Sequence, residues 1–234
     1  MAQINNDIIE RYKKVATATI NSAMRASGYG DSFPRGVHCF TPDNQMMVGV
    51  AKTLRFIPPR PDIIKETHKG EASPEYEAMG SCKPGDVLVI DGMGKKYAAI
   101  GGDVKLLQLK MARAGGLVTD AAIRDLDIVK DYGFKIYAGG RTPMGGADEI
   151  DPYEANVTIQ CGGVAVRPGD LIVGDNDGVI VVPEALATDV LEWAEEHEAV
   201  EEFIKELISK ENVAPGKYYP ITQNTIDLYR RSLK

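Results

Sequence analysis

The 234 residues are 44% hydrophobic and 26% charged, a composition typical of a globular protein that buries a sizeable core. The formal net charge of -7 argues against a nucleic-acid partner, because binding to phosphates needs a basic surface. No apolar run approaches the roughly 20 residues of a membrane span, and residues 1–7 lack a signal-peptide core. We therefore expect a cytoplasmic protein with neither a membrane nor a nucleic acid as partner.

The cysteines and histidines are scattered along the chain. Cys39, Cys82 and Cys161 form no C-x-x-C pair, so neither a zinc ribbon nor a redox motif is predicted, and reduced thiols are expected. A His-rich metal site is not predicted either. The three histidines lie far apart: His38, His68 and His197. The acidic balance of the chain is nevertheless compatible with binding a metal cation.

The N-terminal part predicts two helices and then a strand. A first helix can be capped by Asn6 or Asp7, and a second helical stretch is ended by Gly28. Residues 49–56 read as a strand. Residues 57–77 begin with the run I-P-P-R-P, which cannot be helical because each proline lacks an N–H, and continue as polar sequence that is helical in parts.

One motif occurs twice. Residues 83–91 (K-P-G-D-V-L-V-I-D) recur as residues 167–175 (R-P-G-D-L-I-V-G-D). Pro-Gly fits the central positions of a type II turn, since proline fixes φ and glycine allows positive φ. Each copy is therefore predicted to be a turn that feeds a buried strand. The copies can be two related half-domains with a site between them, or two similar turns at sheet edges, and the second interpretation is favoured.

The rest of the chain alternates helix and strand and then becomes β-rich. The predicted elements are a helix over 104–114, a strand over 117–119, a short helix over 125–132, a strand over 134–138, and strands over 157–160, 163–166, 171–174 and 178–182. A helix over about 184–210 follows Pro183, and an aromatic turn at 215–220 is expected to dock on the body or a neighbouring subunit. This order predicts a single α/β domain over 1–234, with a mixed central sheet flanked by helices and a long C-terminal helix.

Two dipeptides suggest a functional site. Gly102-Asp103 opens the helix over 104–114, and Arg124-Asp125 follows the predicted strand. Their charged side chains can therefore meet at one rim of the sheet. Beside them lie the free N–H groups of the helix N-terminus, around Val104 and Lys105, which suit a carboxylate.

The residue types at this rim also suggest a division of roles. Gly102 lets a ligand approach the backbone closely. Arg124 presents a planar fork for carboxylate or enolate oxygens, and Asp125 is an oxygen ligand suited to Mg²⁺ or Mn²⁺. Asp103 can orient or deprotonate a water molecule on that cation. Spacing alone favours a plainer interpretation, in which Arg124 and Asp125 are surface residues and Asp103 only caps a helix.

The surrounding motifs change that balance. The pattern G-G-D-x20-R-D is preceded by G-D-V-L-V-I-D-G and followed by C-G-G-V-A-V-R-P-G-D-L-I-V-G-D-N-D-G-V-I-V-V-P. From about Thr17 to Pro183 the chain resembles the RraA-like family, which includes the 4-hydroxy-4-methyl-2-oxoglutarate aldolases and the regulator of ribonuclease E activity. The resemblance implies a fold of the β/β/α swivelling type with a core over about 17–183. The segment 184–234, with its P-G-K-Y-Y-P, resembles a longer branch of the family with a C-terminal extension.

The resemblance also assigns roles at the rim. The substrate-binding loop falls on Gly102, Asp103, Val104 and Lys105. Arg124 binds the substrate and, with Asp103, is the implied catalytic residue, while Asp125 is the implied ligand of the divalent cation. The chain departs from the family's pattern at three places: Ala121 stands where glycine is usual, Ile128 where an acidic residue is frequent, and Pro58-Pro59-Arg60 where the aldolases contact substrate.

Aldolases of the family also recruit a glutamate from the C-terminal region of a neighbouring subunit. The candidates in this chain are Glu198, Glu201 and Glu202, and a homo-oligomer, either trimer or hexamer, is implied.

The implied function is a metal-dependent lyase that cleaves 4-hydroxy-2-oxo acids to pyruvate by a retro-aldol reaction, with oxaloacetate decarboxylation expected from the same enolate-stabilising site. The resemblance equally allows a non-enzymatic, protein-binding regulator of ribonuclease activity. A Schiff-base aldolase would need a buried lysine, and the periodicity buries neither Lys105 nor Lys110. Residues 92–95 (G-M-G-K) mimic part of a phosphate-binding loop but lack its full spacing.

Overall fold

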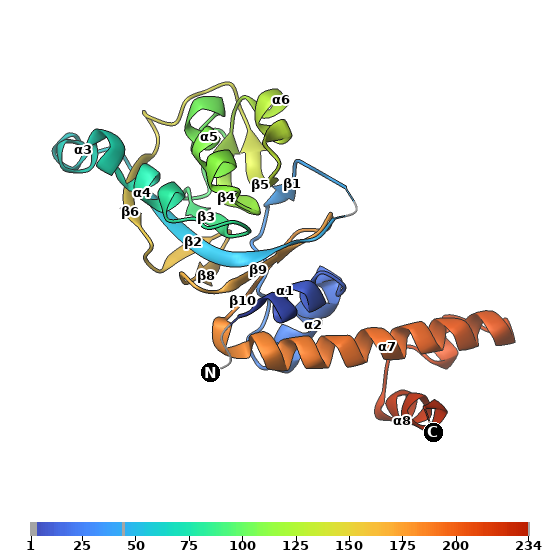
Figure 1. Cartoon of the computed structure of the whole chain (residues 1–234). Helices are drawn as coiled ribbons and strands as arrows, with labels where there is room; N and C mark the ends of the chain where they lie inside the picture. The colour runs from blue at the N-terminus through green and yellow to red at the C-terminus, as the bar shows by residue number, and fades with distance from the viewer. Residues whose placement is uncertain (1–3, 44, 234) are drawn as a thin grey trace.

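A curled, mixed β-sheet organises the structure, and the computed structural model describes residues 4–43 and 45–233 (Figure 1). The strands are β1 (His38–Cys39), β2 (Met47–Ile57), β3 (Val87–Asp91), β4 (Gly116–Ile123), β5 (Lys135–Arg141), β6 (Asp151–Ala155), β7 (Ile159–Cys161), β8 (Val164–Val166), β9 (Leu171–Gly174) and β10 (Val179–Val182). The helices are α1 (Asn6–Tyr12), α2 (Thr17–Ala26), α3 (Pro61–Thr67), α4 (Pro74–Gly80), α5 (Asp103–Ala112), α6 (Leu126–Val129), α7 (Ala187–Glu211) and α8 (Gln223–Ser232). Short 3-10 segments occupy Gly70–Ala72, Lys130–Tyr132, Glu184–Leu186 and Pro215–Lys217.

The sheet combines a parallel centre with antiparallel flanks. Its order is β1-β5-β4-β3-β2-β9-β10, and the four strands from β2 to β5 run parallel to one another, while β1 and β9 are antiparallel to the strands they join. The long strand β2 pairs with β9 through residues 47–50 and with β6 through residues 54–57. Strands β7 and β8 form a separate antiparallel pair. The predicted mixed sheet flanked by helices is confirmed.

Both copies of the repeated motif adopt the predicted turn. Gly85 and Gly169 have φ values of 86° and 100°, the positive values that the third residue of a type II turn requires. In each copy the aspartate N–H donates to the residue three positions earlier, at 3.0 Å to Lys83 O and 3.1 Å to Arg167 O. The strands that follow, β3 and β9, both pair with β2.

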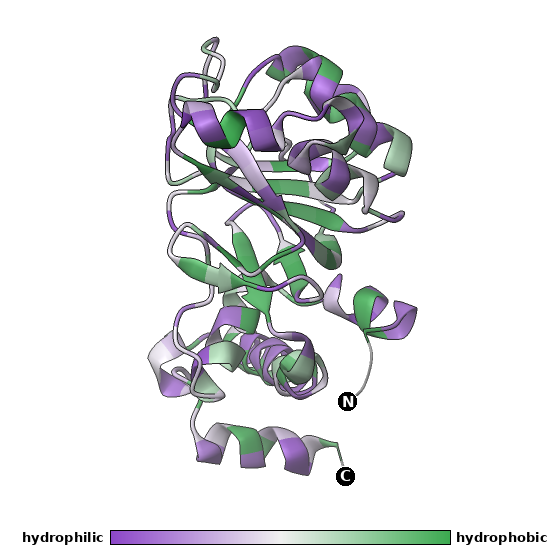
Figure 2. Cartoon of the chain, turned by 90° about the vertical axis from the view of Figure 1, so that its left-hand side faces the viewer, coloured by the Kyte–Doolittle hydropathy of each residue, from purple (hydrophilic) through white to green (hydrophobic). Residues whose placement is uncertain are grey.

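Helices cover the sheet in two groups, seen above and below it in Figure 1. Helices α4, α5 and α6 pack over the parallel strands, where the buried side chains include Leu88, Leu106, Leu117 and Ile136. Helices α1, α2 and α7 cover β9 and β10, with Ile20, Leu171 and Leu191 in the shared core. Figure 2 shows the same division, with hydrophobic strands inside and helices whose outward faces are largely hydrophilic. Helix α7 then continues beyond this core as a projecting arm (Figure 1).

The structure differs from the sequence-based prediction at several elements. Strands β1 and β6 and helix α8 were not predicted, while β4 is longer than predicted. Strand β6 has a weak strand pattern because Pro152 cannot donate a ladder hydrogen bond and because two of its five residues, Asp151 and Glu154, are acidic. Helix α8 begins with a capping box between Thr222 and Thr225, a signal that was overlooked in the polar tail. None of the helices in the described residues is long and apolar enough to cross a membrane.

Candidate active site

The two dipeptides meet because residues 98–102 run beside the end of β4. A β-bulge interrupts β4 between Thr119 and Ala122, and beyond it the strand leaves its register with β3. The N–H of Ile100 then donates to Ala122 O at 2.9 Å, and the N–H of Arg124 donates to Gly101 O at 3.2 Å. These bonds hold Gly102-Asp103 next to Arg124-Asp125, as the sequence predicted.

Gly102 lies against the Asp125 carboxylate. A β-carbon on Gly102 would be 2.1 Å from Asp125 Oδ2 and 2.9 Å from Arg124 Cγ, so no larger residue fits without displacing both side chains. Asp125 has a φ of 56°, a left-handed conformation that aspartate adopts more readily than most residues. Its Oδ2 accepts the Asp103 N–H at 3.2 Å and lies 3.5 Å from Arg124 Nε. One carboxylate oxygen of Asp125 therefore contacts Asp103 of the first dipeptide and Arg124 of its own dipeptide.

The N-terminus of α5 differs in detail from the prediction. The helix begins at Asp103, and Gly102 is its N-cap residue. Asp103 Oδ1 accepts the N–H of Val104 at 2.8 Å, and the N–H of Asp103 is taken by Asp125. Among the described residues, the N–H of Lys105 is left without an acceptor. A carboxylate that binds here would therefore use Lys105 and Arg124, or displace the Asp103 side chain.

A cavity of about 300 Å³ opens in front of these residues. Gly102, Asp103, Val104, Lys105 and Arg124 all lie in its wall, so every predicted substrate-binding residue lines one space. Asp125 lies behind Gly102 and is not part of the lining. The volume is at the lower end of the range for small-molecule sites, which suits a small organic acid.

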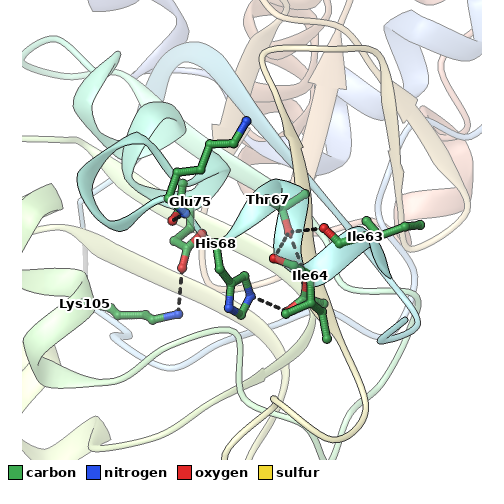
Figure 3. A network of polar contacts seen from close by, with 9 residues as sticks. Ile63, Ile64, Thr67, His68, Glu75 and Lys105 are labelled. Carbon is green, nitrogen blue, oxygen red and sulfur yellow. Dashed lines mark hydrogen bonds and ion pairs between the residues drawn. The ribbon is translucent and has the colours of Figure 1, made fainter. Parts of the chain in front are cut away.

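Other polar side chains in this wall were missed by the sequence prediction. Lys105 Nζ donates to Glu75 Oε1 at 3.1 Å, while the buried Oε2 of Glu75 has no partner among the described residues. His68 Nε2 lies 2.8 Å from Asp151 Oδ1. Figure 3 shows His68, Glu75 and Lys105 extending toward one another. His68 follows α3, Glu75 lies in α4, Lys105 in α5 and Asp151 in β6, and no sequence motif links elements so far apart.

The geometry supports neither a Schiff-base aldolase mechanism on a buried lysine nor a preformed metal cluster. No lysine is among the buried residues of the described chain, and Lys105 Nζ lies 3.1 Å from Glu75 Oε1. The described residues contain no group of three or more His, Cys, Asp or Glu side chains arranged around a metal position. Asp125 is thus a single carboxylate ligand candidate.

The three C-terminal glutamates lie on α7 and have partners within the same chain. Glu198 accepts from Thr19 Oγ1 at 2.8 Å. Glu201 lies 3.7 Å from His197 Nε2, and Glu202 is 3.2 Å from Lys205 Nζ. None of them lines the cavity of this chain.

A second, more open cavity lies near the ends of β3 and β4. Its lining includes Asp91, Asp120 and Gln160. The Gln160 amide donates to carboxylate oxygens of both aspartates, and the N–H of Gly92 donates to Asp120 Oδ1 at 2.8 Å. Burial raises the pKa of the Asp91 carboxyl, and the neighbouring Asp120 adds to this rise. The two carboxylates thus connect β3, β4 and β7.

The comparison with known families is consistent with this geometry. The model of the RraA-like family, described as Aldolase/RraA, matches residues 17–181. The chain belongs to the RraA-like family. Both dipeptides of the candidate site and both copies of the Pro-Gly motif fall within the matched residues.

Relatives in this RraA-like family carry two kinds of name. A protein of Halalkalibacterium halodurans named "Putative 4-hydroxy-4-methyl-2-oxoglutarate aldolase" is 33% identical over 220 residues, which are 93% of this chain and 96% of that protein. A Hahella chejuensis protein of the same name is 39% identical over 105 residues, 44% of this chain and 62% of that one. The crystal structure of Streptomyces coelicolor RraAS2, "an unusual member of the RNase ES inhibitor RraA protein family", superposes with a TM-score of 0.77 at 30% identity. That superposition covers 88% of this chain and 98% of RraAS2.

Proposed function

We propose that this RraA-like protein is a divalent-metal-dependent lyase that cleaves 4-hydroxy-2-oxo acids to pyruvate by a retro-aldol reaction, and that it also decarboxylates oxaloacetate. The observation that carries the proposal is the convergence of Gly102–Lys105 and Arg124 on one cavity, with Asp125 directly behind. The names of the relatives from Halalkalibacterium halodurans and Hahella chejuensis support an aldolase.

The residues present fit a hard divalent cation. Magnesium usually keeps several waters and takes one or two protein carboxylates together with oxygens of the substrate. Asp125 supplies one such carboxylate, and the hydrogen bonds of the described residues use its Oδ2 and not its Oδ1. The bare backbone of Gly102 keeps the space in front of that carboxylate free of a side chain. A cation bound here would supply Lewis-acid stabilisation of the enolate.

The protein's own groups account for binding and for the first proton transfer. Arg124 and the N–H of Lys105 bind the carboxylate of the 2-oxo acid, and the guanidinium adds positive charge where the enolate develops. The Asp103 carboxylate accepts the proton of the 4-hydroxyl group, directly or through a water molecule. The C3–C4 bond then breaks, C4 becomes a carbonyl carbon, and the electron pair passes into the pyruvate enolate.

A pyruvate-release assay tests the proposal. The chain is incubated with a set of 4-hydroxy-2-oxo acids and with oxaloacetate, with Mg²⁺ or Mn²⁺ and with EDTA. We expect release with either cation, none with EDTA, and loss of release in Asp125→Ala and Arg124→Ala. Asp127→Asn is the matched control, because that carboxylate lies two residues away and its side chain is 98% exposed. Full activity in Asp125→Ala or in EDTA would contradict the site.

A second candidate function is protein-binding regulation of a ribonuclease, and the similarity to RraAS2 favours it. The measurement is cleavage of a model RNA by an RNase E-type enzyme as this chain is titrated in. Regulation independent of the lyase site predicts that Asp125→Ala inhibits as well as the wild type. No inhibition at a large molar excess would remove this candidate.

We also propose that the chain forms a homo-oligomer. Helix α5 exposes an apolar stripe beside the cavity, in which the side chains of Val104 and Met111 are 81% and 77% exposed. Leu107 of the same helix and Ile128 of α6 are also exposed, and apolar side chains at such spacing suit a subunit contact. Light scattering distinguishes monomer, trimer and hexamer, and a monomeric mass would contradict the proposal.

A further inference from the structure

His68 lies where α3 ends and faces the candidate cavity. It is the C-cap residue of α3, its imidazole is 51% exposed, and it is part of the cavity wall. Its Nε2 is 2.8 Å from Oδ1 of Asp151, whose side chain is 5% exposed. A half-exposed imidazole is thus hydrogen-bonded to a buried carboxylate in the wall of the candidate active site.

Asp151 fixes the orientation and the tautomer of this imidazole. It is the first residue of β6, paired with Ile57 of β2, and its Oδ2 is also within 3.5 Å of Thr67 Oγ1. An ionised carboxylate can only accept hydrogen bonds, so Nε2 of His68 carries the proton that is donated to Asp151. Nδ1 is then the ring atom that can gain or lose a proton. A histidine oriented in this way is a common arrangement for acid–base catalysis.

The other charged groups of the cavity are poorly suited to donate a proton near neutral pH. Apart from Asp151, they are Glu75 of α4, Asp103 and Lys105 of α5, and Arg124 after β4. Arginine does not deprotonate in proteins, and carboxylates are ordinarily ionised at this pH. The Lys105 ammonium is paired with Glu75 (Figure 3). The imidazolium of His68 is therefore the suitable acid in this wall.

We propose that His68, oriented by Asp151, is the general acid that protonates C3 of the pyruvate enolate, an inference that rests on the proposed lyase function. The enolate C2–C3 electron pair takes the proton from Nδ1 and forms the new C3–H bond. C2 regains its carbonyl, and the imidazolium becomes neutral imidazole. Solvent returns a proton to Nδ1, and the proton taken from the 4-hydroxyl leaves Asp103 to solvent, so charge and atoms balance. Decarboxylation of oxaloacetate needs the same protonation step.

The step can be measured in reverse, without cleavage of any carbon–carbon bond. Purified protein with Mg²⁺ and pyruvate is placed in D₂O, and the loss of methyl protons is followed by proton NMR. We expect exchange in the wild type and a decrease of about 100-fold or more in His68→Asn, the usual scale for loss of a general acid or base. Pyruvate affinity, measured by calorimetry, stays within about twofold. Free imidazole should restore part of the exchange in His68→Ala.

Two further variants separate catalysis from structure. His38→Gln is the matched control, because His38 is an exposed histidine on β1, outside the cavity. Asp151→Asn should reduce exchange and change its pH profile, since the tautomer of His68 is no longer fixed. Wild-type exchange in His68→Asn would overturn the inference. A wild type that releases pyruvate but exchanges no methyl protons would overturn it while leaving the lyase function intact. A wild-type protein that neither releases pyruvate nor exchanges methyl protons would overturn both this inference and the proposed lyase function.

Discussion

Gly102 and Asp125 are in such close contact that a β-carbon on residue 102 would lie 2.1 Å from the carboxylate oxygen Oδ2. Gly102 has an extended backbone that any residue can adopt, so this position requires glycine because of space and not because of φ. The packing of the Gly102-Asp103 dipeptide against the Arg124-Asp125 dipeptide thus depends on the absence of a side chain at residue 102.

Replacing Gly102 by alanine tests this fit. Because the methyl group displaces Asp125 and Arg124, we expect Gly102→Ala to lower pyruvate release by about 100-fold, the scale of a misplacement near 1 Å, while the protein stays folded. Steady-state kinetics and circular dichroism measure the two effects. Gly216→Ala is the matched control, since a β-carbon there meets nothing within 4 Å. Unchanged kinetics in Gly102→Ala would mean that Asp125 is free to move without consequence.

The Glu75–Lys105 pair predicts a non-additive effect on stability. Lys105→Met removes the one hydrogen-bond partner that the buried Glu75 carboxylate has among the described residues, which also offer its Oε2 no partner, so we expect a loss of about 1–3 kcal/mol. The lower part of this range applies because the Lys105 side chain is 38% exposed. The double variant Glu75→Leu/Lys105→Met should recover much of the loss. Urea unfolding of the four proteins gives the coupling, and strictly additive changes would show that the pair is not coupled.

Asp91 predicts a dependence of stability on pH. Burial raises the pKa of its carboxyl in the folded protein above the unfolded value of about 3.9. The proton is therefore bound more tightly in the folded state, and its contribution to stability is fully present below the unfolded pKa and is lost as pH rises through the folded pKa. Asp91→Asn should not show this loss. Urea unfolding from about pH 4 upward measures the difference. A constant gap between wild type and Asp91→Asn across this range would contradict the prediction, and Asp127→Asn, with an exposed carboxyl, is the control.

The hydrogen bond of Tyr12 predicts a modest loss of stability on substitution, at the point where α1 meets the start of α7. Its buried hydroxyl donates to Ala187 O at 2.8 Å and so ties α1 to the start of α7. Tyr12→Phe should cost about 1 kcal/mol in the free energy of unfolding, the usual value for one hydrogen bond. Tyr29→Phe, at an exposed position, should leave it unchanged. Equal stabilities of wild type and Tyr12→Phe would show that Ala187 finds another donor.

Most of the fold was predictable because it depends on local patterns. Apolar runs bounded by turn residues located β2, β3, β9 and β10, and the two Pro-Gly turns have the positive φ at Gly85 and Gly169 that their sequence requires. Strand β1 was missed because it has two residues, and β6 because Pro152 and its acidic neighbours do not resemble a strand. A strand of that kind forms only because β2 offers it an edge.

The candidate site was predictable on one side only. Two dipeptides next to predicted elements, together with the family resemblance, placed Asp103, Arg124 and Asp125 at one rim. The segment around Ala99 that joins them was not predicted, because its bonds to β4 begin after a β-bulge that leaves no sequence signal. His68, Glu75 and Asp151 were missed for a related reason. Each comes from a different segment of the chain, and tertiary packing alone brings them together.

Residues at the β-bulge in β4 and just after it line two different cavities. Asp120 lines the open cavity with Gln160, and Arg124, four residues further on, lines the candidate active site. The two cavities share no lining residue. A substitution at the lining of one cavity therefore replaces no residue in the wall of the other, although both walls use residues at the end of β4 or just after it.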